Sequence, residues 1–120
     1  MKKVVIGCLL IVVLLCGCSS NNDNDLISYM NAKEKIINNG AVLVDVRTNE
    51  EYNENHINGA INIDVSDINE DSISKIIFSM EAEIIVYSNN GNRSNQAKEL
   101  LNEYGYSNVY DLGSINNWKE

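Results

Sequence analysis

The loop at residues 88–93 combines residue types that can bind an anion. It lies between the apolar run 83–87 and a segment, starting near Ser94, whose apolar residues recur with helical spacing. Backbone N–H groups in a strand-to-helix loop and the positive end of the helix dipole favour a negatively charged ligand. Arg93 adds a permanent positive charge and a planar set of donors. The residues expected to form this site are Ser88, Asn89, Asn90, Gly91, Asn92 and Arg93.

The first position of such a loop would hold a nucleophile, and Ser88 occupies it here. A serine hydroxyl stays protonated at neutral pH and needs an adjacent general base to act. His56 is the single histidine of the chain, and it lies in a turn after a different strand, without the spacing of a catalytic triad. Two interpretations of Ser88 stay open: a helix cap that fills a loop position, and part of an anion site without turnover.

Apolar runs typical of buried parallel strands alternate with helical segments along the chain. The expected strands are residues 41–46, 61–63, 83–87 and 108–111. This alternation predicts one α/β domain with a mainly parallel central sheet flanked by helices. Ligands of such sheets bind beyond the carboxyl ends of the strands, where Asp45 and Ser88 both lie.

Capping residues and glycines mark the expected helices. Ser28 and Thr48 are expected N-caps, Gly40 and Gly105 are expected stops, short helices are expected within 66–80, and residues 112–114 are expected to turn into a terminal helix that carries Trp118. The residues expected to face the core from these helices are Tyr29, Met30, Ile36, Ile37, Ile68, Ile73, Ile76, Ile77, Ala97, Leu100, Leu101 and Tyr104.

Charged residues outside the loop are expected to have structural roles. Asp45 and Arg47 have the residue types of an acid–base pair, but we expect their side chains on opposite faces of the strand. A structural ion pair or loop contact is therefore expected for each. Glu50 and Glu51 are expected to lie in the first turn of the helix that Thr48 caps. No metal or cofactor is expected from these patterns.

Three ordered motifs resemble the signatures of rhodanese domains, over roughly residues 26–120. The first signature is matched by Asp45-Val46-Arg47, Glu50-Glu51-Tyr52 and the run from His56 to Ile63. The active-site loop is matched by Ile85-Val86-Tyr87 followed by residues 88–93, and the closing signature by residues 108–113 with Trp118. Asn58 and Ser114 depart from the family pattern, which has proline and glycine at these positions.

The resemblance implies a sulfur-transfer site in which a cysteine thiolate takes a sulfur atom from thiosulfate and holds it as a persulfide. Ser88 occupies the position of this cysteine, residues 89–93 would line the anion cradle, Arg93 would bind the oxygens of the donor, and His56 would be structural. A serine cannot form the sulfur–sulfur bond of a persulfide. We therefore expect a non-catalytic module that binds a small oxyanion or a protein partner. The alternative is an enzyme, with Ser88 replacing a natural cysteine or with another donor.

The N-terminal residues resemble a bacterial lipoprotein signal. Lys2 and Lys3 precede an apolar run, and Leu15-Cys16-Gly17-Cys18 has the layout of the cleavage site. We expect residues 1–17 to be a signal peptide, residues 18–25 a lipidated Cys18 with a flexible tether, and residues 26–120 the folded domain. The alternative is an uncleaved anchor. Both place the protein at the outer face of the cell membrane, attached to the bilayer.

Cleavage would leave 7 basic and 17 acidic residues, a net charge of −10. A chain this acidic is a poor partner for nucleic acid and is repelled by anionic lipid. The three cysteines are Cys8, Cys16 and Cys18, so the lipidated mature chain would contain no free thiol and no disulfide.

Overall fold

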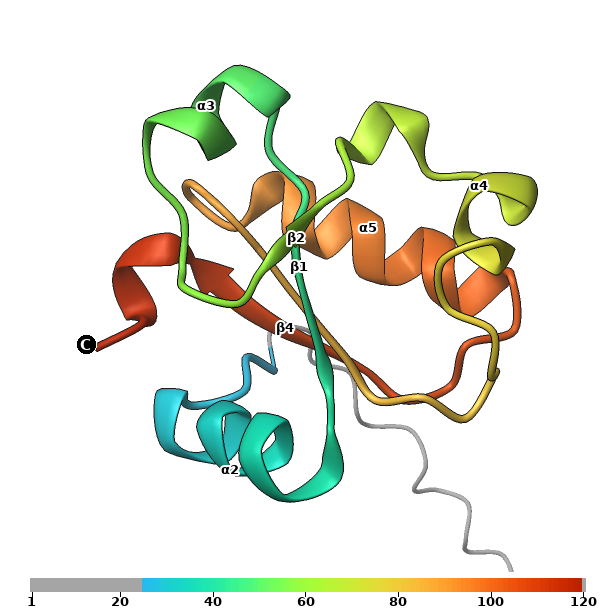
Figure 1. Cartoon of the computed structure of the whole chain (residues 1–120), viewed down its shortest axis with the longest axis horizontal. Helices are drawn as coiled ribbons and strands as arrows, with labels where there is room; N and C mark the ends of the chain where they lie inside the picture. Colours follow the sequence, from blue (N-terminus) through green and yellow to red (C-terminus); the bar gives the residue numbers. More distant parts are fainter. Residues whose placement is uncertain (1–24, 120) are drawn as a thin grey trace, which may run out of the picture.

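A computed structural model describes residues 25–119, and its centre is a sheet of four parallel strands in the order β2-β1-β3-β4 (Figure 1). The strands are β1 (Val42–Asp45), β2 (Ile61–Asn62), β3 (Ile84–Ser88) and β4 (Val109–Ser114). The expected α/β class, single domain and parallel sheet are confirmed. The expected signal peptide and residues 18–24 of the tether lie outside the described residues.

Helices connect the strands, and several of them begin after a capping side chain. The helical elements are α2 (Tyr29–Asn39), α3 (Asn49–Glu54), η2 (Val65–Asp67), α4 (Glu70–Ser74), α5 (Asn92–Glu103) and η3 (Ile115–Asn117). Ser28 and Thr48 accept hydrogen bonds from the backbone N–H groups of Asn31 and Glu51, as expected for N-caps. Gly40 follows α2 in the left-handed conformation, with φ of 70°, which terminates that helix.

Both faces of the sheet are buried, so strand side chains alternate between two hydrophobic cores. In β3, Ile84 and Val86 pack on the side of α5, while Ile85 and Tyr87 pack on the side of α2. α2 and α5 lie on opposite sides of the strands in Figure 1. This two-sided burial explains why the strand reads as a continuous apolar run in the sequence.

Three of the residues expected in the core are largely exposed. Met30 and Ile37 of α2 are 69% and 68% exposed, and Ile76 is 45% exposed. The small side chain of Ala32 is the fully buried one in α2, with Ile36 partly buried beside it. α2 is thus rotated so that Ala32, and not Met30 or Ile37, faces the sheet. The small side chain of an alanine allows a helix to lie close to the strands.

The C-terminal segment also differs from the expectation. Residues 112–114, expected as a turn, continue β4 to Ser114, and the terminal helix is a single 3₁₀ turn that ends before Trp118. β4 carries one extra residue against β3, because Val86 pairs with Asp111 while Tyr87 pairs with Gly113. Leu112, the residue without a partner in β3, lies in the core on the side of α2, as does Tyr110 two residues earlier.

The strand register brings the functional residues to one edge of the sheet. Asp45 pairs with Tyr87, so Ser88 lies one residue beyond the end of β1. Ser88 pairs with Ser114 on its other side. The loop after β3 and the segment after β1 therefore meet at the carboxyl edge. Within residues 25–119, no helix is both long and apolar enough to span a bilayer.

Candidate functional site

Ser88 is the last residue of β3, and its side chain is fully buried. Its Oγ accepts hydrogen bonds from the backbone N–H groups of Gly91, at 3.2 Å, and Ser94, at 3.1 Å. Gly91 is the N-cap residue of α5 and has a φ of 93°, a conformation that favours glycine. The N-cap has no side chain of its own, so Ser88 supplies the acceptor for the first turn of the helix. The interpretation of Ser88 as a helix cap is confirmed.

His56 is not positioned to activate Ser88. Its Nδ1 lies 2.8 Å from the carbonyl oxygen of Tyr52, and its ring stacks on the Tyr52 ring with 3.8 Å between centroids. The hydrogen bonds of Ser88 Oγ within residues 25–119 come from two backbone amides, neither of which can take its proton. The hydroxyl is therefore an unactivated acceptor.

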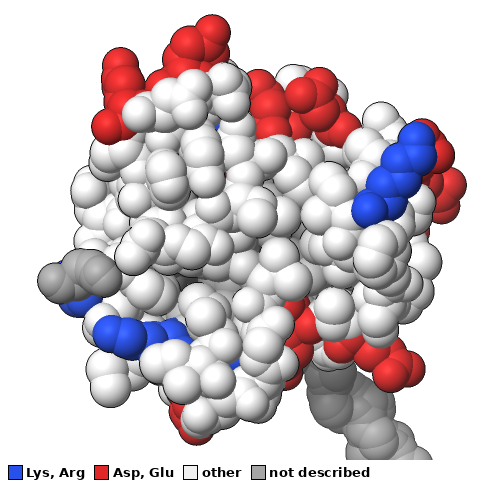
Figure 2. Space-filling view, in the orientation of Figure 1, with Lys and Arg blue, Asp and Glu red and all other residues white. Residues whose placement is uncertain are grey.

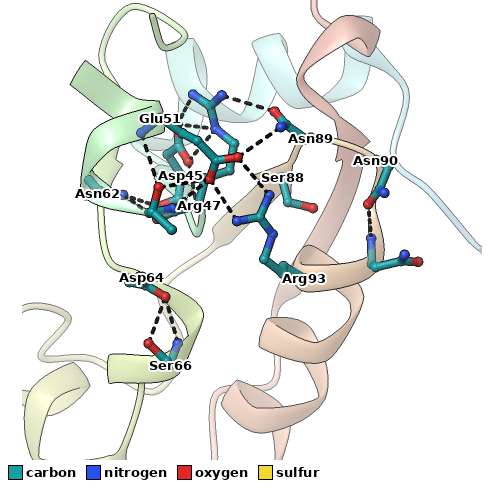
Figure 3. A network of polar contacts seen from close by, with 12 residues as sticks. Asp45, Arg47, Glu51, Asn62, Asp64, Ser66, Ser88, Asn89, Asn90 and Arg93 are labelled. Atoms are coloured by element: carbon teal, nitrogen blue, oxygen red, sulfur yellow. Dashed lines mark hydrogen bonds and ion pairs between the residues drawn. The ribbon is translucent and has the colours of Figure 1, made fainter. Parts of the chain in front are cut away.

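Arg93, at the start of α5, is held by Glu51 from the first turn of α3 (Figure 3). Nη1 and Nη2 donate to Oε1 and Oε2 at 2.8 and 3.2 Å, and the two side chains are 31% and 28% exposed. The hydrogen bonds from Arg93, together with those from Thr48, lower the pKa of Glu51 to about 2. The same contact raises the pKa of Arg93.

Asn89 connects this ion pair to a second arginine. Its Nδ2 donates to Glu51 Oε2 at 3.0 Å, while its Oδ1 accepts from Arg47 Nη1 at 3.1 Å. The next residue, Asn90, accepts a hydrogen bond from the backbone N–H of Asn92 through its side chain. The loop is thus shaped partly by its own amide side chains and partly by α3.

Asp45 and Arg47 form a buried ion pair at the end of β1. Arg47 Nη2 and Nε donate to the Asp45 carboxylate at 2.7 and 3.0 Å, with the side chains 0% and 3% exposed on the aspartate and arginine. A structural ion pair was expected, but the expectation of opposite faces was wrong. Residues two apart on extended backbone point to the same side. The hydrogen bond to Asp45 raises the pKa of Arg47.

Several contacts around the loop had no signal in the sequence pattern. Glu51 was expected only as a first-turn residue, whereas it also binds Arg93, 42 residues away. Asn62 donates to the backbone oxygens of both Asp45 and Arg47. The buried hydroxyl of Tyr87 accepts from the N–H of Ile57. Thr48 and Glu51 have the spacing of a capping box, which could have indicated that the carboxylate points back along its helix.

A hollow of about 510 Å³ borders the outer side of the loop. It lies between the start of α5 and the end of β4, and its lining includes Asn90, Gly91, Asn95, Lys98 and Asn117. Amide groups, one lysine and the apolar side chain of Leu26 line it, and Asp25 and Asp111 contribute acidic groups. No cluster of three metal-ligating His, Cys, Asp or Glu side chains occurs within the described range 25–119.

Together these features define a class of domain: a parallel α/β sheet whose third strand runs into a glycine-containing loop at a helix N-terminus. The rhodanese-like domain model matches residues 28–120, and the chain belongs to that family. The sequence is 39% identical over 72 residues to thiosulfate sulfurtransferase PspE of Escherichia coli, covering 60% of this chain and 68% of the relative. It is 36% identical over 83 residues to thiosulfate sulfurtransferase GlpE of Pseudomonas fluorescens, covering 67% and 72%.

Solved structures agree with this assignment. A rhodanese with anions from E. coli superimposes with a TM-score of 0.61 at 35% identity, covering 64% of this chain and 89% of that chain. The Alr3790 protein from Anabaena superimposes with a TM-score of 0.68 at 26% identity, covering 77% and 83%. The family resemblance of the three sequence motifs is thereby confirmed.

Proposed function

We propose that this chain is a rhodanese-like domain that does not transfer sulfur and that uses residues 88–93 as an anion-binding or interaction site. The observation that carries the proposal is Ser88, whose hydroxyl stands at the end of β3 and accepts from two backbone amides. A thiolate at this position would be stabilised by the same two donors and by the helix N-terminus. The hydroxyl stays neutral there, and oxygen cannot form the persulfide.

The anion-binding part of the proposal has three supports. α5 is a helix of 12 residues whose N-terminus lies at the loop, so the positive end of its dipole favours an anion. Arg93 is 31% exposed, which leaves it reachable from solvent. One structure at 35% identity is described as a rhodanese with anions. A small oxyanion, or an acidic side chain of a protein partner, fits these groups.

Sulfur transfer is the second candidate function, because the relatives described above are named thiosulfate sulfurtransferases. The loop retains the glycine with positive φ and the arginine at its end. A cysteine at residue 88 would place a sulfur atom against the N–H groups of Gly91 and Ser94. The loop that sulfur transfer requires therefore differs from the present loop only in the side chain at residue 88.

Sulfur transfer from thiosulfate to cyanide, measured on the full chain in detergent, separates the two candidates. We expect no turnover above the rate without protein for the unchanged chain, and measurable thiocyanate formation for Ser88→Cys. Ser114→Cys is the matched control, because it introduces a thiol at the end of the neighbouring strand. That variant is expected to stay inactive.

Turnover by the unchanged chain would overturn the non-catalytic assignment. A folded but inactive Ser88→Cys variant would show that the loop no longer binds the donor, and it would remove the support for an anion site. Folding of each variant is checked by circular dichroism.

We also propose that the domain is attached to the outer face of the cell membrane through acyl chains on Cys18. The support is the sequence pattern of Leu15 to Cys18 after a short apolar run. Several acyl chains are required, because one chain binds a bilayer only weakly. A domain with this acidic balance gains nothing from anionic headgroups, so the lipid is the attachment.

A further inference from the structure

We propose that Glu51 is a built-in carboxylate ligand of the loop and that it determines which anions the loop accepts, by competing for Arg93. This inference rests on the proposed anion site at residues 88–93. Its basis is that the two terminal nitrogens of Arg93 each donate to one oxygen of Glu51, at 2.8 and 3.2 Å. An incoming oxyanion needs the same edge of the guanidinium, formed by Nη1 and Nη2. Arginine binds carboxylates and other oxyanions through two parallel hydrogen bonds from such an edge.

The carboxylate of Glu51 accepts three further hydrogen bonds, and the backbone N–H of Glu51 forms a fourth contact with the N-cap residue Thr48. Oε1 accepts from the backbone N–H and the hydroxyl of Thr48 at 2.9 and 3.1 Å, and the N–H of Glu51 donates back to that hydroxyl at 3.2 Å. Oε2 accepts from the side chain of Asn89 at 3.0 Å. Glu51 therefore reaches the loop in a fixed orientation and loses little side-chain freedom by binding Arg93.

Each of the two arginines near the loop is already paired with a carboxylate, so an incoming anion must compete with Glu51 for Arg93. Arg47 is neutralised by the buried Asp45, and Arg93 is neutralised by Glu51, so the four groups sum to zero. Asp64 also acts on Arg93 with a favourable charge interaction, while Arg47 acts against it. Figure 3 shows the side chains of Asp45, Arg47, Glu51 and Arg93 gathered around the start of the loop. A ligand that displaces Glu51 must therefore itself carry at least two oxygens and a full negative charge.

A selectivity follows from this geometry. Dianionic oxyanions such as sulfate or thiosulfate offer more charge than the carboxylate they displace, and the positive end of the α5 dipole favours this additional charge. Monoanions of single-point geometry, such as chloride, offer neither the charge nor the paired oxygens. The unmodified loop is expected to discriminate against them.

The test is a sulfate titration of the full chain in detergent at constant ionic strength, followed through the backbone amide resonances of residues 88–94. Glu51→Gln removes the charge of the competitor and keeps a side chain that can complete the capping box. Its Kd for sulfate is expected to fall by about two- to fivefold, the size of effect typical of a partly exposed ion pair. Glu50→Gln is the matched control: it removes the same charge from the same helical turn, and Glu50 forms none of the ion pairs found within residues 25–119.

Each result bears on one of the two proposals. Equal sulfate affinity in the unchanged chain and Glu51→Gln would overturn the role of Glu51 and leave the anion site standing. An equal gain in Glu50→Gln would also overturn it, because the effect would then be general charge. Absence of binding in all three chains would overturn the anion site together with this inference.

A measurement on the unchanged chain covers the case in which Glu51→Gln does not fold. The carboxyl ¹³C resonance of Glu51 and the Nε resonance of Arg93 are recorded during the same sulfate titration. Displacement of the carboxylate moves both resonances with one binding curve. Movement of the loop amides with an unchanged Glu51 carboxyl resonance would contradict the competition.

Discussion

At the scale of single residues, one atom separates this loop from that of a sulfur-transfer site. Ser88 and cysteine have nearly the same shape, so the hydroxyl still caps the first turn of α5. Their chemistry differs, because a helix N-terminus lowers the pKa of a thiol into the neutral range, while a hydroxyl remains far from ionising. Under the proposed function, Ser88 keeps the capping role but does not act as a nucleophile.

Glu51 predicts an acid dependence of stability. Its pKa is about 2 in the folded chain and lies near its ordinary value of 4.5 when the chain unfolds. A carboxylate with a lowered folded pKa stabilises the fold fully above pH 4.5 and loses that contribution as the pH falls toward 2. The difference in unfolding free energy between the unchanged chain and Glu51→Gln, from urea titrations, is thus expected to be largest at neutral pH and to shrink below pH 4.5.

Glu50→Gln is again the control for this pH series. A difference between the unchanged chain and Glu51→Gln that stays constant from pH 7 to pH 2.5 would contradict the assigned ionisation of Glu51.

At the scale of elements, the Asp45–Arg47 pair connects three parts of the carboxyl edge. Asp45 ends β1, and Arg47 also donates to the carbonyl oxygen of Asn55 behind α3 and to Asn89 in the loop. Asn62 of β2 binds the backbone oxygens of both charged residues. The position of α3, and with it that of Glu51, therefore depends on a buried charge pair.

Arg47→Met is expected to destabilise the fold strongly, because it leaves the carboxylate of Asp45 buried without its partner. The expected loss of unfolding free energy is about 3–5 kcal/mol, measured by urea denaturation at pH 7. Lys75→Met breaks the exposed Lys75–Asp71 pair, whose side chains are 71% and 80% exposed, and should leave the urea midpoint essentially unchanged. Equal losses of unfolding free energy in the two variants would show that the buried pair stabilises the fold no more than the exposed pair does.

At the scale of the whole molecule, the surface is acidic. Figure 2 shows acidic side chains over α3 and α4 at the edge of one face, with a largely uncharged centre. The basic side chains on the face shown lie at its lower left and right edges, and basic residues are fewer than acidic ones in the chain as a whole. The proposed attachment to a membrane through acyl chains on Cys18 does not require a basic surface.

Processing at Cys18 is checked by mass spectrometry of the N-terminal peptide from chain expressed in a lipoprotein-processing bacterium. We expect a peptide that begins at Cys18 and carries the added mass of acyl chains. Cys18→Ser should abolish this product, whereas Cys16→Ser, the matched control two residues earlier, should leave it intact. A native N-terminus at Met1 in the unchanged chain would refute the processing.

Much of the fold was predictable from the sequence, because its signals are local. The caps at Ser28 and Thr48, the stop at Gly40 and the apolar run of β3 each act within a few residues. Where the prediction was wrong, the observed structure depends on contacts between segments that are distant in the sequence. Packing against the sheet turned Ala32 of α2 inward in place of Met30, and pairing with β3 extended β4 through Ser114.

The sequence by itself determined the class of domain, the loop and the identity of Ser88 at its first position, since these depend on residue types and their order along the chain. The tertiary structure alone decided what Arg93 faces. Its partner Glu51 lies 42 residues away, on a helix positioned by the buried pair at the end of β1. Such a contact depends on how strands and helices pack in space, and no local pattern encodes it.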